Sequence, residues 1–241
     1  MKTIKNIILI ILILILRQNG EAQGFLNLNF ESANPSGHPP NSSDVPVTSA
    51  FPGWSVSYGT PGVGTNAAST VWYDGLSLGG AFVSVNDTNT GSGFVPLQGR
   101  YSAYLFGGLS SGGNPTYSTI SQTGLVPNGT LSLLMDVKPW NGFSVSLGGQ
   151  TINMVALQTF SSYTLYGGDI SAFAGQSVQL SITAPPTSIP NGVLLDDIVF
   201  SPSSVPEPST LALGALGTLL LGFRRWRQKA TPCEAAVCFK S

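Results

Sequence analysis

Apolar and polar residues alternate in short runs along the middle of this chain. In Trp54–Tyr58, Phe143–Leu147 and Val178–Ile182 every second residue is apolar. Such alternation places one face of a strand against a core and leaves the other in water, as in antiparallel sheets. Runs rich in β-branched and aromatic residues predict further strands at Phe25–Glu31, Thr70–Tyr73, Gly80–Val85, Tyr101–Phe106, Tyr117–Gln122, Thr130–Val137, Thr151–Ala156, Thr159–Tyr166 and Val193–Phe200.

Turn signals separate these runs and indicate the fold class. The triplet PNG at 127–129 and 190–192 and the triplet WNG at 140–142 are typical of tight turns. Before the C-terminal segment, no window repeats its apolar residues with the period of a helix. We therefore predict an all-β domain over residues 23–204. Its expected form is a two-sheet antiparallel sandwich of jelly-roll type, with a closed barrel as the alternative.

The N-terminus predicts a secretory signal peptide over residues 1–22. Lys2 and Lys5 precede ten apolar residues, Ile7–Leu16, and small residues at Gly20 and Ala22 fit a cleavage site after Ala22. Such a peptide directs a chain to the Sec translocon. The alternative is an uncleaved anchor helix, but ten residues rise only about 15 Å as a helix, whereas the hydrocarbon core is about 30 Å thick.

The predicted domain is acidic. Residues 23–204 contain two basic residues, Arg100 and Lys138, and eight acidic residues, which leave a formal charge of −6. The acidic residues are Glu31, Asp44, Asp74, Asp87, Asp136, Asp169, Asp196 and Asp197. A domain so poor in Lys and Arg lacks the basic patch that nucleic acids or anionic membrane surfaces require. We therefore expect no nucleic-acid partner.

Candidate catalytic residues are few, and we predict none. His38 is the chain's single histidine and lies in a proline-rich segment, where a Ser-His-Asp arrangement is not favoured. Asp196 and Asp197 are neighbours on a predicted strand, so they point to opposite faces and cannot form a catalytic pair by themselves. Asp136 or Asp169 could complete one, so a secreted hydrolase of the glycoside-hydrolase kind remains the alternative.

The order of several loose motifs resembles the galactose-binding-like, carbohydrate-binding-module type of jelly roll. The motifs are NLNFE, FPGWSV, LQGRYSAYLF, ISQTGLVPNGTLSLLMDV and LLDDIVF, and they extend over most of residues 24–202. The resemblance implies that the first and last strands lie close together and share a structural calcium ion. Glu31, Asp196 and Asp197 are then the candidate ligands, since Ca²⁺ takes carboxylate oxygens. The alternative is that these carboxylates are hydrated.

The same resemblance implies that exposed aromatic side chains stack against sugar rings. Trp140 lies beside a turn and is the best exposed candidate. Trp72 and Tyr73 are neighbours on a predicted strand and must face opposite ways, so one of them can face outward. Trp54 alternates with Val56 and Tyr58 and is predicted to lie in the core. Polysaccharide is therefore a candidate partner.

The segment Val205–Lys229 has three parts. Pro206, Glu207 and Pro208 form an extended entry, and a predicted membrane helix over residues 209–223 follows. Arg224, Arg225 and Arg227 close it, and basic residues at this end keep it in the cytoplasm. The thirteen apolar or small residues Leu211–Phe223 rise about 20 Å as a helix, which is short for a stable span.

This tripartite segment strongly resembles the PEP-CTERM sorting signal of Gram-negative bacteria. The resemblance implies recognition by an exosortase in the membrane, cleavage near the Pro-Glu-Pro motif, and release to the cell surface or the extracellular matrix where exopolysaccharide is produced. The alternative is a stable single-pass membrane anchor. Residues 230–241 extend further than the family's usual ending; we expect a disordered cytoplasmic tail whose Cys233 and Cys238 are free thiols.

The sequence thus predicts an exported bacterial surface or matrix protein. Its β-sandwich is expected to be a non-catalytic binding or structural module, with polysaccharide as the candidate ligand, no required cofactor, and a structural Ca²⁺ ion as the one candidate metal.

Overall fold

The computed structural model describes residues 24–75, 79–90, 95–110, 112–140, 142–186 and 191–205. The chain divides into two compact units, Met1–Ser203 and Ser204–Ser241. The predicted signal peptide, the Pro-Glu-Pro motif, the helix at 209–223 and the tail at 230–241 lie outside the described residues. Within the described ranges, no helix combines the length and the apolar character needed to cross a membrane.

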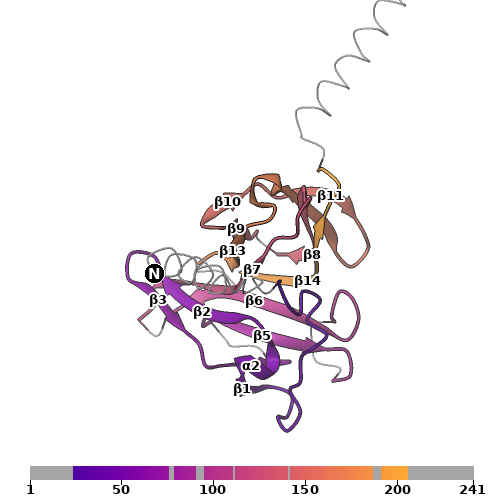
Figure 1. The fold of residues 1–241 in the computed structure, drawn as a ribbon. Coiled ribbons are helices and arrows are strands. Elements are labelled where there is room, and N and C mark those ends of the chain that lie inside the picture. The colour runs from indigo at the N-terminus through magenta and orange to yellow at the C-terminus, as the bar shows by residue number, and fades with distance from the viewer. Residues whose placement is uncertain are drawn as a thin grey trace, which may run out of the picture. The chain divides into compact units, whose positions relative to one another are not determined.

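The described residues form two sheets (Figure 1), which we name sheet A and sheet B. Sheet A has the strand order β10 (Gln150–Ile152), β9 (Ser144–Leu147), β13 (Ser177–Ala184), β7 (Pro115–Leu125), β2 (Ser55–Thr60) and β3 (Gly64–Ala67). All of its pairings are antiparallel.

Sheet B is the larger of the two. Its order is β1 (Ser42–Pro46), β4 (Thr70–Tyr73), β5 (Phe82–Asp87), β6 (Tyr101–Leu109), β14 (Asn191–Ser201), β8 (Ser132–Pro139), β12 (Thr164–Asp169) and β11 (Val155–Thr159). Its pairings are antiparallel except for the parallel pair β4–β5. Short pairings of β6 with β7 join the two sheets, and the helical segments are α2 (Val47–Ala50) and η1 (Ser171–Phe173). The predicted all-β, antiparallel sandwich is confirmed.

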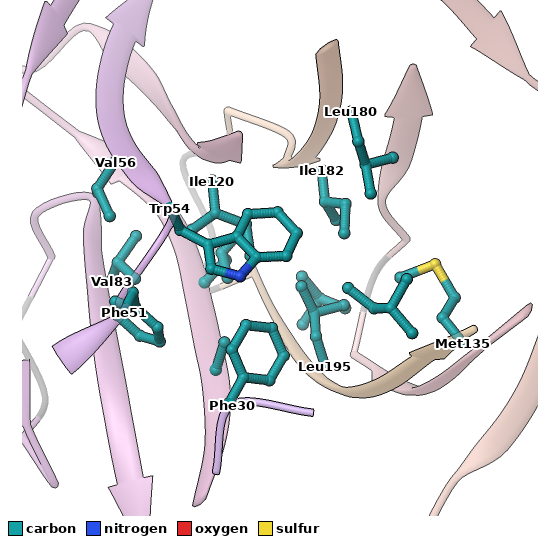
Figure 2. Close-up of a cluster of buried hydrophobic side chains, with 14 of the residues drawn as sticks. Phe30, Phe51, Trp54, Val56, Val83, Ile120, Met135, Leu180, Ile182 and Leu195 are labelled. Carbon is teal, nitrogen blue, oxygen red and sulfur yellow. The ribbon is translucent and has the colours of Figure 1, made fainter. Parts of the chain in front are cut away.

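The inner faces of both sheets contribute to one hydrophobic core. Val56, Ile120, Leu180 and Ile182 come from sheet A, and Val83, Met135 and Leu195 come from sheet B; all are buried. Figure 2 shows these side chains together with the indole ring of Trp54 in one buried cluster. Period-two alternation explains the arrangement, because residues two apart on a strand share a face. Trp54 is buried, as predicted, and its Nε1 donates to the carbonyl of Asn27 at 3.1 Å.

The prediction of a first strand at Phe25–Glu31 is wrong. Only Gly24 makes an isolated bridge there, and Asn27 and Phe30 have positive φ angles of 50° and 57°. These left-handed residues bend the chain so that Phe30 enters the core, with its ring centroid 5.8 Å from that of Trp54. The polar positions of the run are used in turns, since Asn27 Oδ1 accepts the amide of Ser32 at 2.9 Å.

The central strands of sheet B are buried on both faces. Every residue of β5 is buried, and so is all of β6 except its last residue. The inward side chains, such as Val83 and Leu105, belong to the sandwich core, whereas Phe82, Tyr104, Phe106 and Leu194 belong to a second apolar cluster. Because adjacent residues of a strand point to opposite faces, this second cluster lies on the outer face of sheet B.

The core makes one clear stability prediction. Leu195 is fully buried between the sheets, so Leu195→Ala should lower the free energy of unfolding by about 2–5 kcal/mol through lost burial and a cavity. Leu157→Ala is the matched control; its side chain is 37% exposed on the edge strand β11, and the change should be below about 1 kcal/mol. Urea unfolding of the purified protein measures both. Equal losses for the two variants would contradict this description of the core.

Candidate functional site

The outer face of sheet B carries a row of aromatic side chains, which we name the aromatic face. Its residues are Trp72, Phe82, Tyr104, Phe106, Trp140 and Tyr163, with Leu97 and Leu194 packed among them. The ring centroids of Phe82 and Phe106 are 4.9 Å apart, and those of Tyr104 and Trp140 are 5.7 Å apart in an edge-to-face arrangement. The strand register creates this row, since Trp72 pairs with Ser84, Ser84 with Tyr104, and Tyr104 with Leu194.

Two glycines make room for the rings. A Cβ atom on Gly192 would lie 2.2 Å from the Tyr104 hydroxyl oxygen, and a Cβ atom on Gly75 would lie 2.2 Å from the Trp72 ring. Neither approach is compatible with a side chain. Gly192 therefore lets Tyr104 lie flat across β14, and Gly75 lets Trp72 lie against the chain that follows β4.

The structure separates the three predicted sugar-binding aromatics. Trp140 is 44% exposed and Trp72 is half-buried, and both belong to the aromatic face. Tyr73 points the other way, is buried, and donates its hydroxyl hydrogen to Asp87 at 2.9 Å, so it is not part of this surface. Lys138 places its Nζ 5.6 Å from the Trp140 ring centroid and adds a cation beside it.

Residues 95–100, which precede β6, pack against part of the aromatic face, and their last residue, Arg100, is held by two carboxylates. Arg100 donates to the fully buried side chain of Asp87 through Nε at 3.1 Å and Nη2 at 2.9 Å. Burial opposes ionisation of Asp87, but hydrogen bonds from Arg100, the Asn89 amide and Tyr73 hold its pKa below the ordinary value. Glu31 Oε1 accepts the amides of Arg100 and Tyr101 at 2.8 and 2.9 Å.

Leu97 and Gln98 attach this segment to the centre of the outer face. Leu97 is buried in the aromatic cluster, and its amide donates to Ser102 Oγ at 2.9 Å. The Gln98 amide donates to Asp196 Oδ2 at 3.1 Å, and its side-chain Nε2 donates to Asp136 Oδ2 at 3.2 Å and to the Tyr163 hydroxyl at 2.8 Å. Gln98 thus connects two carboxylates with the aromatic face. The sequence did not predict this role of Gln98, because no local pattern shows that an exposed glutamine will hydrogen-bond to several side chains from other strands.

Asp136 and Asp196 are cross-strand neighbours in the register of β8 and β14. Burial raises the pKa of Asp136, and the hydrogen bond from Gln98 opposes that rise. Asp196 is 1% exposed, and burial raises its pKa to about 7. Ser102 Oγ at 2.5 Å and the amides of Gln98 and Asp197 donate to its carboxylate and oppose the rise.

The predicted calcium ligands are brought into one region. Ile198 N donates to Leu28 O at 3.0 Å, so the N-terminal segment lies beside β14, although it is not the strand that the resemblance implied. A bulge at Asp196–Val199 keeps Asp196 buried and turns Asp197, with φ 44°, outward. Within the described ranges, no three His, Cys, Asp or Glu side chains are close enough together to hold a metal ion. These residues do not form a calcium cage by themselves, and calcium stays a prediction.

The other candidate residues lie away from the aromatic face. His38 lies in the turn region before β1, and Asp44 lies in β1. The distance from His38 Nδ1 to Asp44 Oδ1 is 3.1 Å. Asp169 Oδ1 accepts the Ser171 amide at 2.8 Å, beside the 3-10 turn. Asp169 therefore does not pair with Asp196, whereas Asp136 does lie opposite it.

Residues 204–228 match the family model of the PEP-CTERM protein-sorting motif. The match implies an exported protein that is sorted to the cell surface by an exosortase. It includes the predicted sorting residues Pro206, Glu207, Pro208, Arg224, Arg225 and Arg227.

Two solved structures are similar to this chain at low identity. One is TmCBM61 in complex with β-1,4-galactotriose, at 15% identity over 73% of this chain and 96% of that one, with a TM-score of 0.39. The other is the enzymatically active domain of bacteriophage CBA120 tailspike protein 4, at 13% identity over 61% of this chain and 19% of that one, with a TM-score of 0.36. No curated protein matches the chain.

The raised pKa of Asp196 predicts a specific pH dependence. A group whose pKa is higher in the folded protein than in the unfolded chain favours folding at low pH, and this contribution is lost as the pH rises towards the folded value of about 7. The free energy of unfolding should therefore fall from about pH 4 to about pH 7, and Asp196→Asn should reduce that fall.

Asp197→Asn is the matched control for this measurement. It makes the same chemical change at the neighbouring exposed position, and asparagine tolerates the positive φ there. Its pH profile, followed by chemical unfolding, should keep most of the wild type's fall, because Asp196 is intact and only the charge that raises the pKa of Asp136 is removed. A profile for Asp196→Asn as steep as the wild type's would show that Asp196 does not carry the dependence.

Proposed function

We propose that this is an exported surface or matrix protein whose β-sandwich binds extracellular polysaccharide through the aromatic face. The observation that carries the proposal is the joint placement of Trp72 and Trp140 on the outer face of sheet B, flanked by polar groups. The sorting-motif match supports the location, since it implies release at the surface of a cell.

The chemistry of the aromatic face suits sugar rings. A sugar presents a weakly apolar face of C–H groups and an edge of hydroxyls, so it binds where an aromatic plane lies beside hydrogen-bonding groups. Trp140 offers a partly exposed ring with Lys138 beside it, and Gln98 and Tyr163 offer donors and acceptors elsewhere along the aromatic face. Trp72 supplies a second, half-buried indole at the other side of the Phe82–Tyr104 cluster.

The charge of the domain selects among polysaccharides. Residues 23–204 carry a formal charge of −6, and Asp136, Asp196 and Asp197 lie at the border of the aromatic face. An acidic surface repels a polyanion, and Lys138 alone does not reverse that field. The proposed ligand is therefore a neutral polysaccharide rather than one rich in uronic acids.

Asp136 and Asp196 form the carboxylate pair that a hydrolase would need, but their surroundings support binding rather than catalysis. They are 5% and 1% exposed, and Gln98 and Ser102 already bond their oxygens. A general acid and a nucleophile must reach a glycosidic bond. We therefore propose that the pair secures Gln98 and the loop above it.

The binding proposal predicts that removing either indole ring weakens the affinity for polysaccharide. Trp140→Ala and Trp72→Ala should each weaken retention on the neutral exopolysaccharide of the producing cell by about tenfold, because a stacked ring contributes on the order of 1 kcal/mol or more. Affinity electrophoresis in gels containing that polysaccharide measures the change. Tyr117→Ala is the control, since Tyr117 lies on β7 in sheet A, away from the aromatic face. Unchanged mobility of both Trp variants would refute the proposal.

The sorting proposal predicts that the Pro-Glu-Pro motif governs release. Replacing Pro206, Glu207 and Pro208 by alanine should leave the protein in the membrane fraction, because the exosortase no longer recognises its motif. Replacing Thr231, Pro232 and Glu234 by alanine, outside the matched residues 204–228, is the matched control and should leave release intact. Fractionation and immunoblotting of the producing cell measure both, and release of the motif variant at the wild-type level would instead favour a motif-independent route.

A further inference from the structure

A cleft of about 470 Å³ lies where the two sheets are joined, away from the aromatic face. Tyr58, Thr60 and Thr116 of sheet A line it, together with the tip of the β2–β3 hairpin at Val63. Ala81 and Leu109 line the side contributed by sheet B, where Leu109 N donates to Gly79 O at 2.8 Å. The volume is within the range of small-molecule sites.

The hydroxyl groups in this cleft have fixed directions. Thr116 Oγ1 donates to the carbonyl of Asn114 at 3.1 Å, so its 3.2 Å contact with Thr60 Oγ1 is a hydrogen bond in which Thr60 donates. The lone pairs of Thr60 Oγ1 are then left to accept. Tyr58 accepts the Val83 amide at 3.1 Å, so the hydrogen of its own hydroxyl is left to donate. A donor and an acceptor therefore lie side by side on the same face of β2.

The cleft also has an uncharged lining. None of the described residues that line it is Asp, Glu, Lys, Arg or His. The apolar contribution comes from Val63, Ala81 and Leu109, and the polar contribution comes from hydroxyls, an amide side chain and backbone. One step further along the same face of β7, the buried Ser118 Oγ has no hydrogen-bond partner among the described residues. Ser118 is fully buried and does not line the cleft, so the groups left for a ligand are the hydroxyl hydrogen of Tyr58 and the lone pairs of Thr60.

We infer that this cleft is a second binding site, which takes a small uncharged polyhydroxyl ligand, namely the end of a neutral saccharide. A vicinal pair of sugar hydroxyls supplies one donor for Thr60 and one acceptor for Tyr58, and the C–H face of the sugar lies against Val63 and Leu109. A carboxylate or phosphate finds no counter-charge there, so it is excluded by desolvation. The site is formed without any residue of the aromatic face, so neither site depends on the other.

Binding of defined sugars to the full chain tests this inference. The protein is held in a polyoxyethylene detergent, which has no sugar head group, and is titrated with lactose, maltose and cellobiose, while amide NMR shifts are followed. At least one disaccharide should produce saturable shifts in β2 and β3, and glucuronate should produce none there. Absence of saturable β2–β3 shifts with all three disaccharides, or equal shifts with glucuronate, would overturn the assignment.

Thr60→Val is the decisive variant, because valine keeps the branched shape that a strand prefers and removes only the hydroxyl. It should weaken binding roughly tenfold, the effect of one lost hydrogen bond to a ligand. Thr119→Val, which removes the Thr119–Thr183 hydroxyl contact on the same sheet, is the control and should bind as the wild type does. Unchanged affinity in Thr60→Val would overturn the inference. Trp140→Ala should leave these β2–β3 shifts unchanged. A result that contradicts binding at the aromatic face can therefore be distinguished from one that contradicts binding in the cleft.

Discussion

The centre of sheet B is apolar on both of its faces, and the rest of the domain is organised around that constraint. One face of β5, β6 and β14 is covered by sheet A through the sandwich core. The other face needs a second cover, because large exposed apolar surface is unfavourable in water. Leu97 and the rings of Trp72, Trp140 and Tyr163 supply that cover. The aromatic face thus stabilises the fold by covering sheet B. The part of it that stays exposed to solvent is the surface available to a ligand.

Covering this outer face buries several carboxylates away from water. Asp87, Asp136 and Asp196 are all buried, and each is stabilised differently. Asp87 has the guanidinium of Arg100, so its pKa stays low. Asp196 has only neutral donors, and burial raises its pKa to about 7. The two environments explain how a domain with so few basic residues holds the residues before β6 in place: an ion pair with Asp87 fixes Arg100, and a network of neutral hydrogen bonds fixes Gln98.

Much of this architecture follows from local pattern, and the failures have physical reasons. Alternation at Trp54–Tyr58 and Val178–Ile182 correctly predicted the strands of sheet A. Phe25–Glu31 alternates equally well, yet left-handed residues at Asn27 and Phe30 override the pattern so that Phe30 can fill the core. The run Thr159–Tyr166 is divided by a turn in which the Phe160 amide donates to the Tyr163 carbonyl, and this turn brings Tyr163 to Gln98.

The candidate sites were predictable only in part. Adjacent residues on a strand face opposite ways, which correctly split Trp72 from Tyr73, whereas the exposure of Asp197 beside the buried Asp196 comes from a bulge that alternation does not predict. The pairing of Asp136 with Asp196 depends on the register of two strands far apart in sequence, and no local signal sets that register. The uncharged cleft depends in the same way on the junction of the two sheets.

Oxidative footprinting of the tryptophans tests the central claim most directly. Trp140 and Trp72 lie on the aromatic face with different exposures, whereas Trp54 is enclosed in the core and serves as an internal reference. In the presence of the neutral exopolysaccharide, the account predicts that oxidation of Trp140 falls strongly, that oxidation of Trp72 falls less, and that Trp54 does not change. Equal oxidation of Trp140 with and without saturating polysaccharide would contradict the account.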